Sequence, residues 1–340
     1  MKVLLIKTSS LGDIVHTFPA LTDAARACPG IEFDWVVEEA FADIATLHPA
    51  VSRVIPCALR RWRKAPIKTW RSGEWRNFKQ ALQASHYDVV IDAQGLIKSA
   101  FITRLTRGER VGLDSQSARE GLSANALDRP LSIPKGAHAI TRLRQLFAQA
   151  LDYPLPTGAP ESGFSPASAL TAENAKQLIF LHGTTWATKH WPEQQWRKLA
   201  TLASAAGTAV WLPWGDDAEK ARAERIAEGL VGVSLLPKMS LAQLFKKMLQ
   251  ANGFVAVDTG LAHLAAAAGL SGVALYGPTD PVLTGVLGER ARSLSAEFPC
   301  APCLQERCMY KGDLGKGFVP PCFSSLPAEL VWRELFVERP

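Results

Sequence analysis

Short apolar runs alternate with amphipathic segments through the first half of the chain. The runs are bounded and rich in β-branched residues, which is typical of buried strands, whereas apolar residues recur at helical spacing in the segments between them. The predicted strands are 2–6, 33–37, 53–56, 89–92 and 110–112. The predicted helices are 14–27, 40–47, 74–84, 96–106 and 137–150.

The same alternation returns after a proline-rich stretch at 153–166, YPLPTGAPESGFSP, whose four prolines with Gly and Ser predict a linker. The predicted strands of the second half are 178–182, 209–213, 232–235, 254–258 and 273–276. Its predicted helices are 192–205, 216–229, 240–250 and 260–268. Strand–helix alternation is typical of a parallel, doubly wound sheet, so we expect two α/β halves.

Length and composition fit a two-domain globular enzyme. The 340 residues exceed one typical core, and 47% hydrophobic with 21% charged residues is ordinary. A net charge of +6 favours a polyanionic partner, for which nucleic acid, anionic lipid and phosphorylated sugar all qualify. Lys7 interrupts the first apolar run, and the Ala/Leu-rich stretch at 261–276 is too short to span a bilayer. We therefore expect a cytoplasmic protein.

The loop after the first predicted strand, KTSSLGD at 7–13, combines Lys7, Asp13 and three hydroxyls. Open α/β sheets bind their ligands at the carboxyl ends of strands, where this loop lies. It is neither a GxGxxG nor a GxxxxGK[ST] loop, which disfavours a nicotinamide-dependent oxidoreductase and a P-loop enzyme. Asp13 fits either a helix cap or a catalytic group. Because Lys7 lies on the same loop, the two side chains could orient each other.

Two loops of the second half suit a diphosphate. HGTTWATK at 182–189 ends a strand in hydroxyls and one lysine, although an ordinary surface loop fits these residues equally well. VDTGLAH at 257–263 leads a strand into a helix, whose free N–H groups and positive end favour an anion. His263 lies one turn into that helix, and we favour a ligand contact over a structural role.

The segment 59–79 concentrates positive charge, with eight Lys or Arg residues against one acid and three interleaved tryptophans. A solvated basic surface is the plainest interpretation. A nucleic-acid site is the second, with basic residues on phosphates and tryptophans on bases. An anionic glycolipid at a membrane surface is the third, with tryptophan at the headgroup level. The basic residues are Arg60, Arg61, Arg63, Lys64, Lys68, Arg71, Arg76 and Lys79.

Four of the six cysteines lie close together near the C-terminus: Cys300, Cys303, Cys308 and Cys322. The first two have metal-ligand spacing, and four thiolates match a closed tetrahedral zinc site, although the last two are spaced more loosely. A cytosolic location disfavours disulfides. A structural zinc site, reduced unligated thiols and an iron–sulfur site are all compatible with this pattern.

Six ordered motifs resemble the ADP-heptose:lipopolysaccharide heptosyltransferases of glycosyltransferase family 9. They are LLIKTSSLGDIVHTFPA (4–20), FLHGTTWATKHWPEQQW (180–196), LPWG (212–215), LPKMSL (236–241), VDTGLAHLAAA (257–267) and YGPTDP (276–281). The segments 54–66 and 92–100 look most like the type I members, heptosyltransferase I. The resemblance implies the α/β GT-B fold, two Rossmann-like doubly wound domains facing a central cleft. Residues 1–160 would bind the acceptor and 161–325 ADP-heptose, and a last helix in 326–340 would pack back on the first domain.

The resemblance also implies the donor-binding residues. Thr184, Thr185 and Lys189 would contact the phosphates of ADP, with Lys189 also counted as catalytic. Asp258 would meet hydroxyls of the transferred heptose. The ribose would contact Glu219, and the adenine Met239, where an exposed helix charge and core packing are the respective alternatives. Thr259, Gly260 and His263 would line the diphosphate and sugar region.

The family's acceptor, Kdo2-lipid A, bears carboxylates and phosphates that arginine forks bind well. The resemblance therefore favours the glycolipid interpretation of the basic segment, with no nucleic acid as partner. We expect a peripheral protein at the anionic inner-membrane surface, on its cytoplasmic side. The acceptor-binding residues would be Lys7, Arg60, Arg61, Arg63, Lys64, Lys98 and Arg119.

The implied reaction moves L-glycero-D-manno-heptose from ADP-heptose to a 3-deoxy-octulosonate hydroxyl with inversion, as the first heptose of the lipopolysaccharide inner core. Inversion in one step needs one base, and Asp13, ionised at pH 7, is the candidate. Asp216 and Asp217 stand at a helix start, where acids cap, so we expect no catalytic metal or other cofactor. Addition of the second heptose, by a heptosyltransferase II, is the alternative, and a nucleic-acid-binding protein is a distant one.

Overall fold

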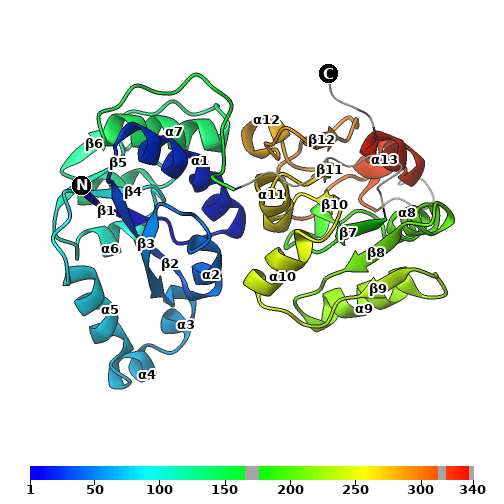
Figure 1. The fold of residues 1–340 in the computed structure, drawn as a ribbon, viewed down its shortest axis with the longest axis horizontal. Helices are drawn as coiled ribbons and strands as arrows, with labels where there is room; N and C mark the ends of the chain where they lie inside the picture. Colours follow the sequence, from blue (N-terminus) through cyan, green and yellow to red (C-terminus); the bar gives the residue numbers. More distant parts are fainter. Residues whose placement is uncertain (165–175, 313–318, 337–340) are drawn as a thin grey trace. The chain divides into compact units, whose positions relative to one another are not determined.

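The computed structural model describes residues 1–164, 176–312 and 319–336 (Figure 1). The chain divides into two compact units, Met1–Gly163 and Phe164–Pro340, and each is described by itself. The division falls inside the proline-rich stretch at 153–166. The described part of that stretch forms no helix or strand, and its last two residues lie outside the described residues.

The first unit is built on a parallel sheet of six strands in the order β3-β2-β1-β4-β5-β6. The chain runs outward from β1 to β3, returns to β4 beside β1, and then runs outward the other way. This reversal makes the carboxyl ends of β1 and β4 the topological switch point, where open sheets bind ligands. The strands are β1 (Lys2–Ile6), β2 (Glu32–Glu38), β3 (Val51–Cys57), β4 (Val89–Asp92), β5 (Glu109–Leu113) and β6 (Arg129–Leu131).

Helices cover both faces of this sheet (Figure 1). Side chains alternate along β2, so Trp35 packs on Phe18 of α1 while Val36 joins the opposite core with Phe78 of α5. Both faces are buried, which explains the nearly continuous apolar strands of the sequence. The helices are α1 (Leu11–Ala27), α2 (Ala42–Ala45), α3 (Leu59–Lys64), α4 (Pro66–Arg71), α5 (Glu74–Gln83), α6 (Ile97–Thr103) and α7 (Ala139–Ala150), with 3-10 turns η1 (Glu39–Phe41) and η2 (Gly121–Ala126).

The second unit repeats this plan with the strand order β12-β11-β10-β7-β8-β9, again all parallel. Its switch point lies between β7 and β10. The strands are β7 (Gln177–Leu181), β8 (Ala209–Leu212), β9 (Val233–Leu235), β10 (Gly253–Val257), β11 (Ser271–Tyr276) and β12 (Ala291–Ser295). The helices are α8 (Glu193–Ala205), α9 (Asp217–Ala227), α10 (Leu241–Met248), α11 (Gly260–Ala267), α12 (Pro281–Thr284) and α13 (Ala328–Leu335), with 3-10 turns η3 (Ala187–Lys189) and η4 (Pro321–Ser325).

Helix α13 packs on the second unit, against α8 and β11. Its apolar face places Val331 and Leu335 in the same core as Trp196 of α8. The Gln195 side chain accepts a hydrogen bond from the backbone N–H of Ala328 at 3.0 Å, which satisfies one free donor of the helix start. The apolar face of α13 is thus buried in the core of the second unit, and the expected packing of this helix on the first domain stays a prediction.

Two strands and three α-helices were absent from the sequence prediction. The missed strands, β6 and β12, are each an edge strand of their sheet, and their sequences RPL and ARSLS mix polar with apolar residues. The missed helices are α3 and α4, in the basic segment, and the four-residue α12. No helix in the described parts of the chain is long and apolar enough to cross a bilayer.

Candidate functional site

The loop after β1 holds a lysine and a carboxylate as an ion pair. Lys7 Nζ lies 3.2 Å from Asp13 Oδ1 and also donates to the carbonyl of Ala93, after β4, at 3.1 Å. Asp13 Oδ2 accepts the backbone N–H of Ser10 at 2.8 Å, which caps the start of α1. Asp13 thus acts as a helix cap, and its catalytic role stays a prediction. It remains 41% exposed, so the carboxylate can still reach a ligand.

The loop after β4 fixes the loop after β1. Gln94 Oε1 accepts the backbone N–H groups of Thr8 and Ser9, at 2.9 and 3.1 Å. Asp92, only 2% exposed, accepts the N–H groups of Gln94 and Gly95 at 2.9 and 3.1 Å. A buried carboxylate therefore orders one loop, and that loop orders the other. Gln94 lies in the segment 92–100, which carries part of the family resemblance, but it was not among the predicted site residues.

The electrostatic surroundings of Asp13 keep it ionised. Burial disfavours its charged form, but the Lys7 ammonium, the Ser10 N–H and the more distant His16 outweigh burial. The pKa of Asp13 is lowered from 3.8 to about 2. Its carboxylate is therefore fully available as a proton acceptor at pH 7, although a low pKa makes it a weak base in this state.

The basic segment is organised around Glu74, at the start of α5. Arg61 on α3 forms ion pairs with Glu39 at 2.9 Å and with Glu74 at 2.8 Å. The indole N–H of Trp62 donates to Glu74 at 2.9 Å. Arg61 was predicted to bind the acceptor, but in this structure its guanidinium is already held by two carboxylates and helps to fasten α3 onto α5.

The other predicted acceptor residues are more available. Arg60 lies over the ring of Phe41, with its guanidinium carbon 5.8 Å from the centroid. Lys98 Nζ donates to Ser9 Oγ at 2.9 Å, and burial followed by the charge of Arg60 lowers its pKa. Three exposed cations form no ion pair with a described residue: Arg63, Lys64 and Arg119. Arg60, Lys98 and Lys7 thus gather near the loop that holds Asp13.

In the second unit, a buried carboxylate after β10 collects partners from three other segments. Asp258 Oδ2 lies 2.7 Å from Lys189 Nζ, at the end of η3, and accepts the Thr279 hydroxyl at 2.7 Å. His263 Nε2 lies 3.8 Å from Asp258 Oδ1. The carboxyl ends of β7, β10 and β11 therefore converge on one cluster.

Asp258 stays charged although it is 6% exposed. Burial opposes its ionisation, but the contacts with His263, Lys189 and Thr279 outweigh burial and hold its pKa far below the ordinary value. Thr279, 8% exposed, was not among the predicted site residues, although it lies in the YGPTDP motif. A hydroxyl three residues beyond the end of β11 was the signal that could have identified it.

The threonines and glycine of the predicted diphosphate region lie around this cluster. Thr184 Oγ1 donates to the backbone carbonyl of Asp258 at 3.0 Å, which ties the loop after β7 to the loop after β10. Thr185 is exposed. Thr259 stands at the N-cap position of α11 without a capping hydrogen bond from its side chain, and Gly260 begins the helix, so the free N–H groups of the helix start lie next to Asp258. The arrangement suits an anion beside Lys189.

Glu219 sits where β7 and β8 end. Its Oε2 accepts the N–H of Gly215 at 2.7 Å, and its Oε1 lies so close to Gly183 that a Cβ there would push the carboxylate aside. Asp216 caps α9 by accepting the N–H of Glu219 at 2.8 Å, as predicted. Met239 is half-buried in the loop before α10 and is not part of the described core clusters, which disfavours the core-packing alternative.

Four cysteines lie close together in the second unit. Cys300, Cys303, Cys308 and Cys322 all line one cavity of about 20 Å³. None of them forms a disulfide, and burial, reinforced by the other three thiols, raises the pKa of Cys322 to about 12. In the described part of the chain no group of three or more His, Cys, Asp or Glu residues is arranged to hold a metal ion. The geometry therefore lends the zinc site no support, and zinc at these thiols stays a prediction.

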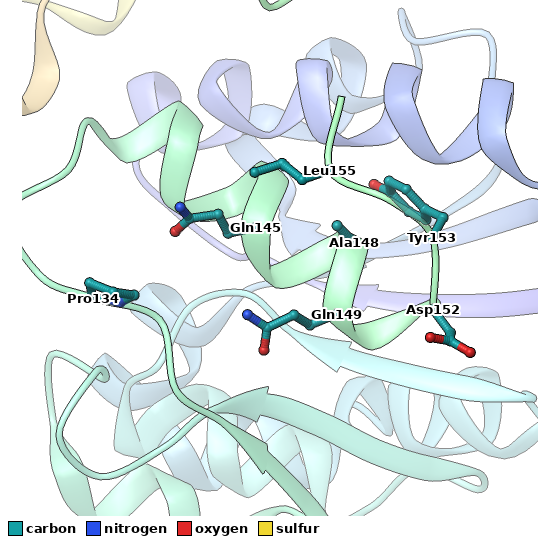
Figure 2. A pocket seen from close by; sticks show the side chains of 7 residues that line it. All are labelled: Pro134, Gln145, Ala148, Gln149, Asp152, Tyr153 and Leu155. Carbon is teal, nitrogen blue, oxygen red and sulfur yellow. The ribbon is translucent and has the colours of Figure 1, made fainter. Parts of the chain in front are cut away.

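A separate hollow of about 380 Å³ lies on the outer side of α7 (Figure 2). Gln145, Gln149 and Asp152 line it together with the ring of Tyr153. None of these residues was predicted to have a function, and none belongs to the loops after β1 and β4. The residues predicted to act in the first unit therefore lie outside the lining of this hollow.

Comparison with known proteins assigns the fold and family. Residues 75–313 match the glycosyltransferase family 9 (heptosyltransferase). Lipopolysaccharide heptosyltransferase 1 of Pseudomonas aeruginosa is 52% identical, over 98% of this chain and 97% of its own. The relative of the same name from Escherichia coli K12 is 48% identical, over 85% and 92%. The structure "E. coli heptosyltransferase WaaC with ADP" superposes with a TM-score of 0.86 at 42% identity, over 98% of this chain and 99% of that one.

These similarities confirm the family that the six motifs predicted. The same similarities confirm the resemblance to the type I members, which the segments 54–66 and 92–100 predicted. They also confirm the fold class, since two parallel doubly wound sheets match the GT-B heptosyltransferase structures. This chain belongs to glycosyltransferase family 9, the heptosyltransferases.

Proposed function

We propose that this enzyme transfers L-glycero-D-manno-heptose from ADP-heptose to the octulosonate of Kdo2-lipid A, adding the first heptose of the inner core. Relatives at 48% to 52% identity are called lipopolysaccharide heptosyltransferase 1. The structure "E. coli heptosyltransferase WaaC with ADP-2-deoxy-2-fluoro heptose" is 42% identical over 98% of this chain. The observation that carries the proposal is the Lys189–Asp258–Thr279 cluster beside the free start of α11.

The donor diphosphate would bind at this cluster. Lys189 supplies a cation, Thr184 and Thr185 supply hydroxyls, and the first turn of α11 supplies N–H groups. Asp258 holds Lys189 in place and offers its remaining lone pairs to heptose hydroxyls. Glu219 would bind the ribose and Met239 the adenine. The leaving ADP gains negative charge as the glycosidic C–O bond breaks, and Lys189 stabilises that charge.

Asp13 would be the general base on the acceptor side. It takes the proton of the attacking hydroxyl while the oxygen bonds to the anomeric carbon from the face opposite ADP, which inverts that carbon. Lys7 holds the carboxylate at 3.2 Å and the Gln94 amide holds the loop. An acceptor carboxylate that attracts Lys7 would weaken its hold on Asp13 and make Asp13 a stronger base.

The anionic groups of the acceptor would meet the cations near this loop. Arg60 and Lys98 are the best placed, because each lies close to Ser9 or Phe41 around the Asp13 loop. Arg63, Lys64 and Arg119 add exposed charge. Arg61 can bind an anionic group of the acceptor only if that group displaces Glu39 or Glu74 from its guanidinium. Such an acceptor is part of a membrane, so we infer a peripheral protein on the cytoplasmic face of the inner membrane.

We infer that catalysis needs no metal, because lysines occupy both charged loops where a metal would otherwise balance charge. Full ADP release in excess chelator is the expected result. Loss of activity that added magnesium restores would overturn this inference.

The decisive experiment measures ADP release from ADP-heptose with two acceptors. One is Kdo2-lipid A, and the other is the same acceptor already carrying one heptose. Turnover with the first alone supports the proposal. Turnover with the second alone would mean that the enzyme adds the second heptose. No turnover with either, despite ADP-heptose binding, would leave the donor site standing and overturn the proposed acceptor.

A further inference from the structure

Helix α4 carries two large apolar side chains that nothing in the described structure covers. Ile67 is 69% exposed and Trp70 is 76% exposed. Residues three apart lie on the same side of a helix, so the two side chains form one apolar ridge. Single exposed apolar residues are common on protein surfaces, but an aliphatic and a tryptophan side by side favour an interaction site.

The helix itself is held in place, so the ridge is not a disordered loop tip. Pro66 starts the helix at a position where proline is favoured. Thr69, on the other side, is 7% exposed and donates to the carbonyl of Ala65 at 3.0 Å. Helix α4 packs on α5, whose start is fixed by the ion pair of Glu74 with Arg61. The ridge is therefore presented by a fixed element.

Cations surround the ridge without acidic partners. Lys64, Lys68 and Arg71 line a hollow of about 690 Å³ together with Ile67. All three are exposed and form no ion pair with a described residue. The one acid of the segment, Glu74, already binds Arg61. This surface thus combines unneutralised positive charge with exposed apolar area.

The tryptophans of the segment argue against a nucleic acid as the partner. Stacking of successive bases needs several exposed rings along a strand. Trp62 is buried, and Trp75 stacks on Phe101 with the centroids 5.6 Å apart. Only Trp70 of the three is well exposed. One exposed indole beside an isoleucine suits the boundary between lipid headgroups and acyl chains instead.

We propose that α4 docks this protein on an anionic phospholipid bilayer. Ile67 and Trp70 enter the headgroup–acyl boundary, and Lys64, Lys68 and Arg71 contact lipid phosphates. Two weak attractions act together, as reversible peripheral binding requires. The inference deepens the proposed function, because docking brings the neighbouring acceptor cations to the level of a lipid-borne sugar. The binding itself involves no substrate and can be measured separately.

The test is co-sedimentation with vesicles, without substrate. Wild-type protein is expected to pellet with phosphatidylglycerol-containing vesicles and not with phosphatidylcholine alone. The double variant I67S/W70S is expected to lose at least about tenfold in affinity for anionic vesicles. The variant K68Q/R71Q is expected to lose on the order of tenfold, and salt should weaken wild-type binding. V231S, which changes another exposed apolar residue, is the matched control and should bind like wild type.

The proposal is overturned if wild-type protein ignores anionic vesicles or if I67S/W70S binds them like wild type. Dependence of binding on an added protein would also overturn it. Circular dichroism and ADP release with a lipid-free octulosonate acceptor show whether each variant is folded. Vesicle binding by a protein that releases no ADP with any acceptor would refute the proposed function and leave the docking surface standing.

Discussion

Each unit holds one lysine–carboxylate pair at its switch point. The more deeply buried member is the lysine in the first unit and the carboxylate in the second. In the first unit the Lys7 side chain is 8% exposed and the Asp13 side chain is 41% exposed. In the second unit the Lys189 side chain is 17% exposed and the Asp258 side chain is 8% exposed. The same ion pair thus offers a carboxylate to solvent on one side and a lysine on the other. The partner that is less buried is the one suited to meet a ligand.

The difference follows from what surrounds each pair. The aliphatic stem of Lys7 passes among buried strand ends, and its ammonium is also held by the Ala93 carbonyl. Asp258 lies instead among His263 and Thr279, which together with Lys189 satisfy a buried charge. The first pair therefore suits the proton acceptance proposed for Asp13, and the second suits the anion binding proposed for Lys189. Four substitutions can break or sharpen this contrast.

Asp13→Asn removes the exposed carboxylate and is expected to have the largest effect. Asparagine keeps the shape but cannot take a proton at neutral pH, so turnover should fall by about 10²–10⁴-fold. ADP release under saturating substrates measures this. Asp43→Asn, an exposed aspartate on α2, is the matched control and should retain normal turnover. Near-normal turnover of a folded Asp13→Asn protein would reduce Asp13 to a helix cap.

Lys189→Met removes the less buried partner of the second pair. ADP release should fall by about 10²–10³-fold, because the leaving diphosphate loses its cation. The free energy of unfolding should also fall by about 3 kcal/mol, because Asp258 becomes a buried charge without its lysine. Lys198→Met, an exposed lysine on α8, is the control. Unchanged turnover together with lower stability would make the pair purely structural.

Lys7→Met tests the opposite pair through pH. Asp13 has a folded-state pKa lowered to about 2, so its carboxylate adds stability above its ordinary pKa of 3.8, which is lost as pH falls through about 2. Without Lys7, burial should bring the pKa back to 3.8 or above. The acid limb of kcat/KM should then appear near pH 4 in the variant and lie lower in wild type. Coincident limbs would show that Lys7 does not control Asp13.

Thr279→Val should give the smallest effect and separates positioning from catalysis. The hydroxyl binds Asp258 and is not expected to touch the reacting atoms, so its loss should cost about 1–2 kcal/mol, roughly five- to thirtyfold in kcat/KM for ADP-heptose. Thr279→Ser should restore the rate because it restores the hydroxyl. A variant with unchanged kcat/KM would show that Lys189 and His263 suffice to hold Asp258.

Local sequence signals predicted all the central strands but missed two of the four edge strands. The apolar residues of β1, β4, β7 and β10 are buried on both faces, so their pattern was unambiguous. The edge strands β6 and β12 pair on one side only and carry polar residues, and no local pattern marked them. Helix α13 was predicted as a helix, but its amphipathic face does not say which of two cores it will join.

The candidate site shows the same division. Lys7, Asp13, Lys189 and Asp258 could be chosen from the sequence, because each lies at the end of a predicted strand or in the loop that follows one. Gln94 and Thr279 could not, because their roles depend on the partners they hold from other strands. Arg61 was selected for its charge, yet Glu39 and Glu74, 22 and 13 residues away along the chain, already bind it.

The amino-acid sequence alone determined the two α/β halves, the family and the loops that carry charge, because periodicity and motifs are local properties of the chain. Only the tertiary structure decided which member of each lysine–carboxylate pair is more exposed, that the four cysteines line one cavity, and that Ile67 and Trp70 share one uncovered ridge. Burial and electrostatic pairing depend on contacts between residues that are distant in the sequence, and a local sequence pattern does not specify those contacts.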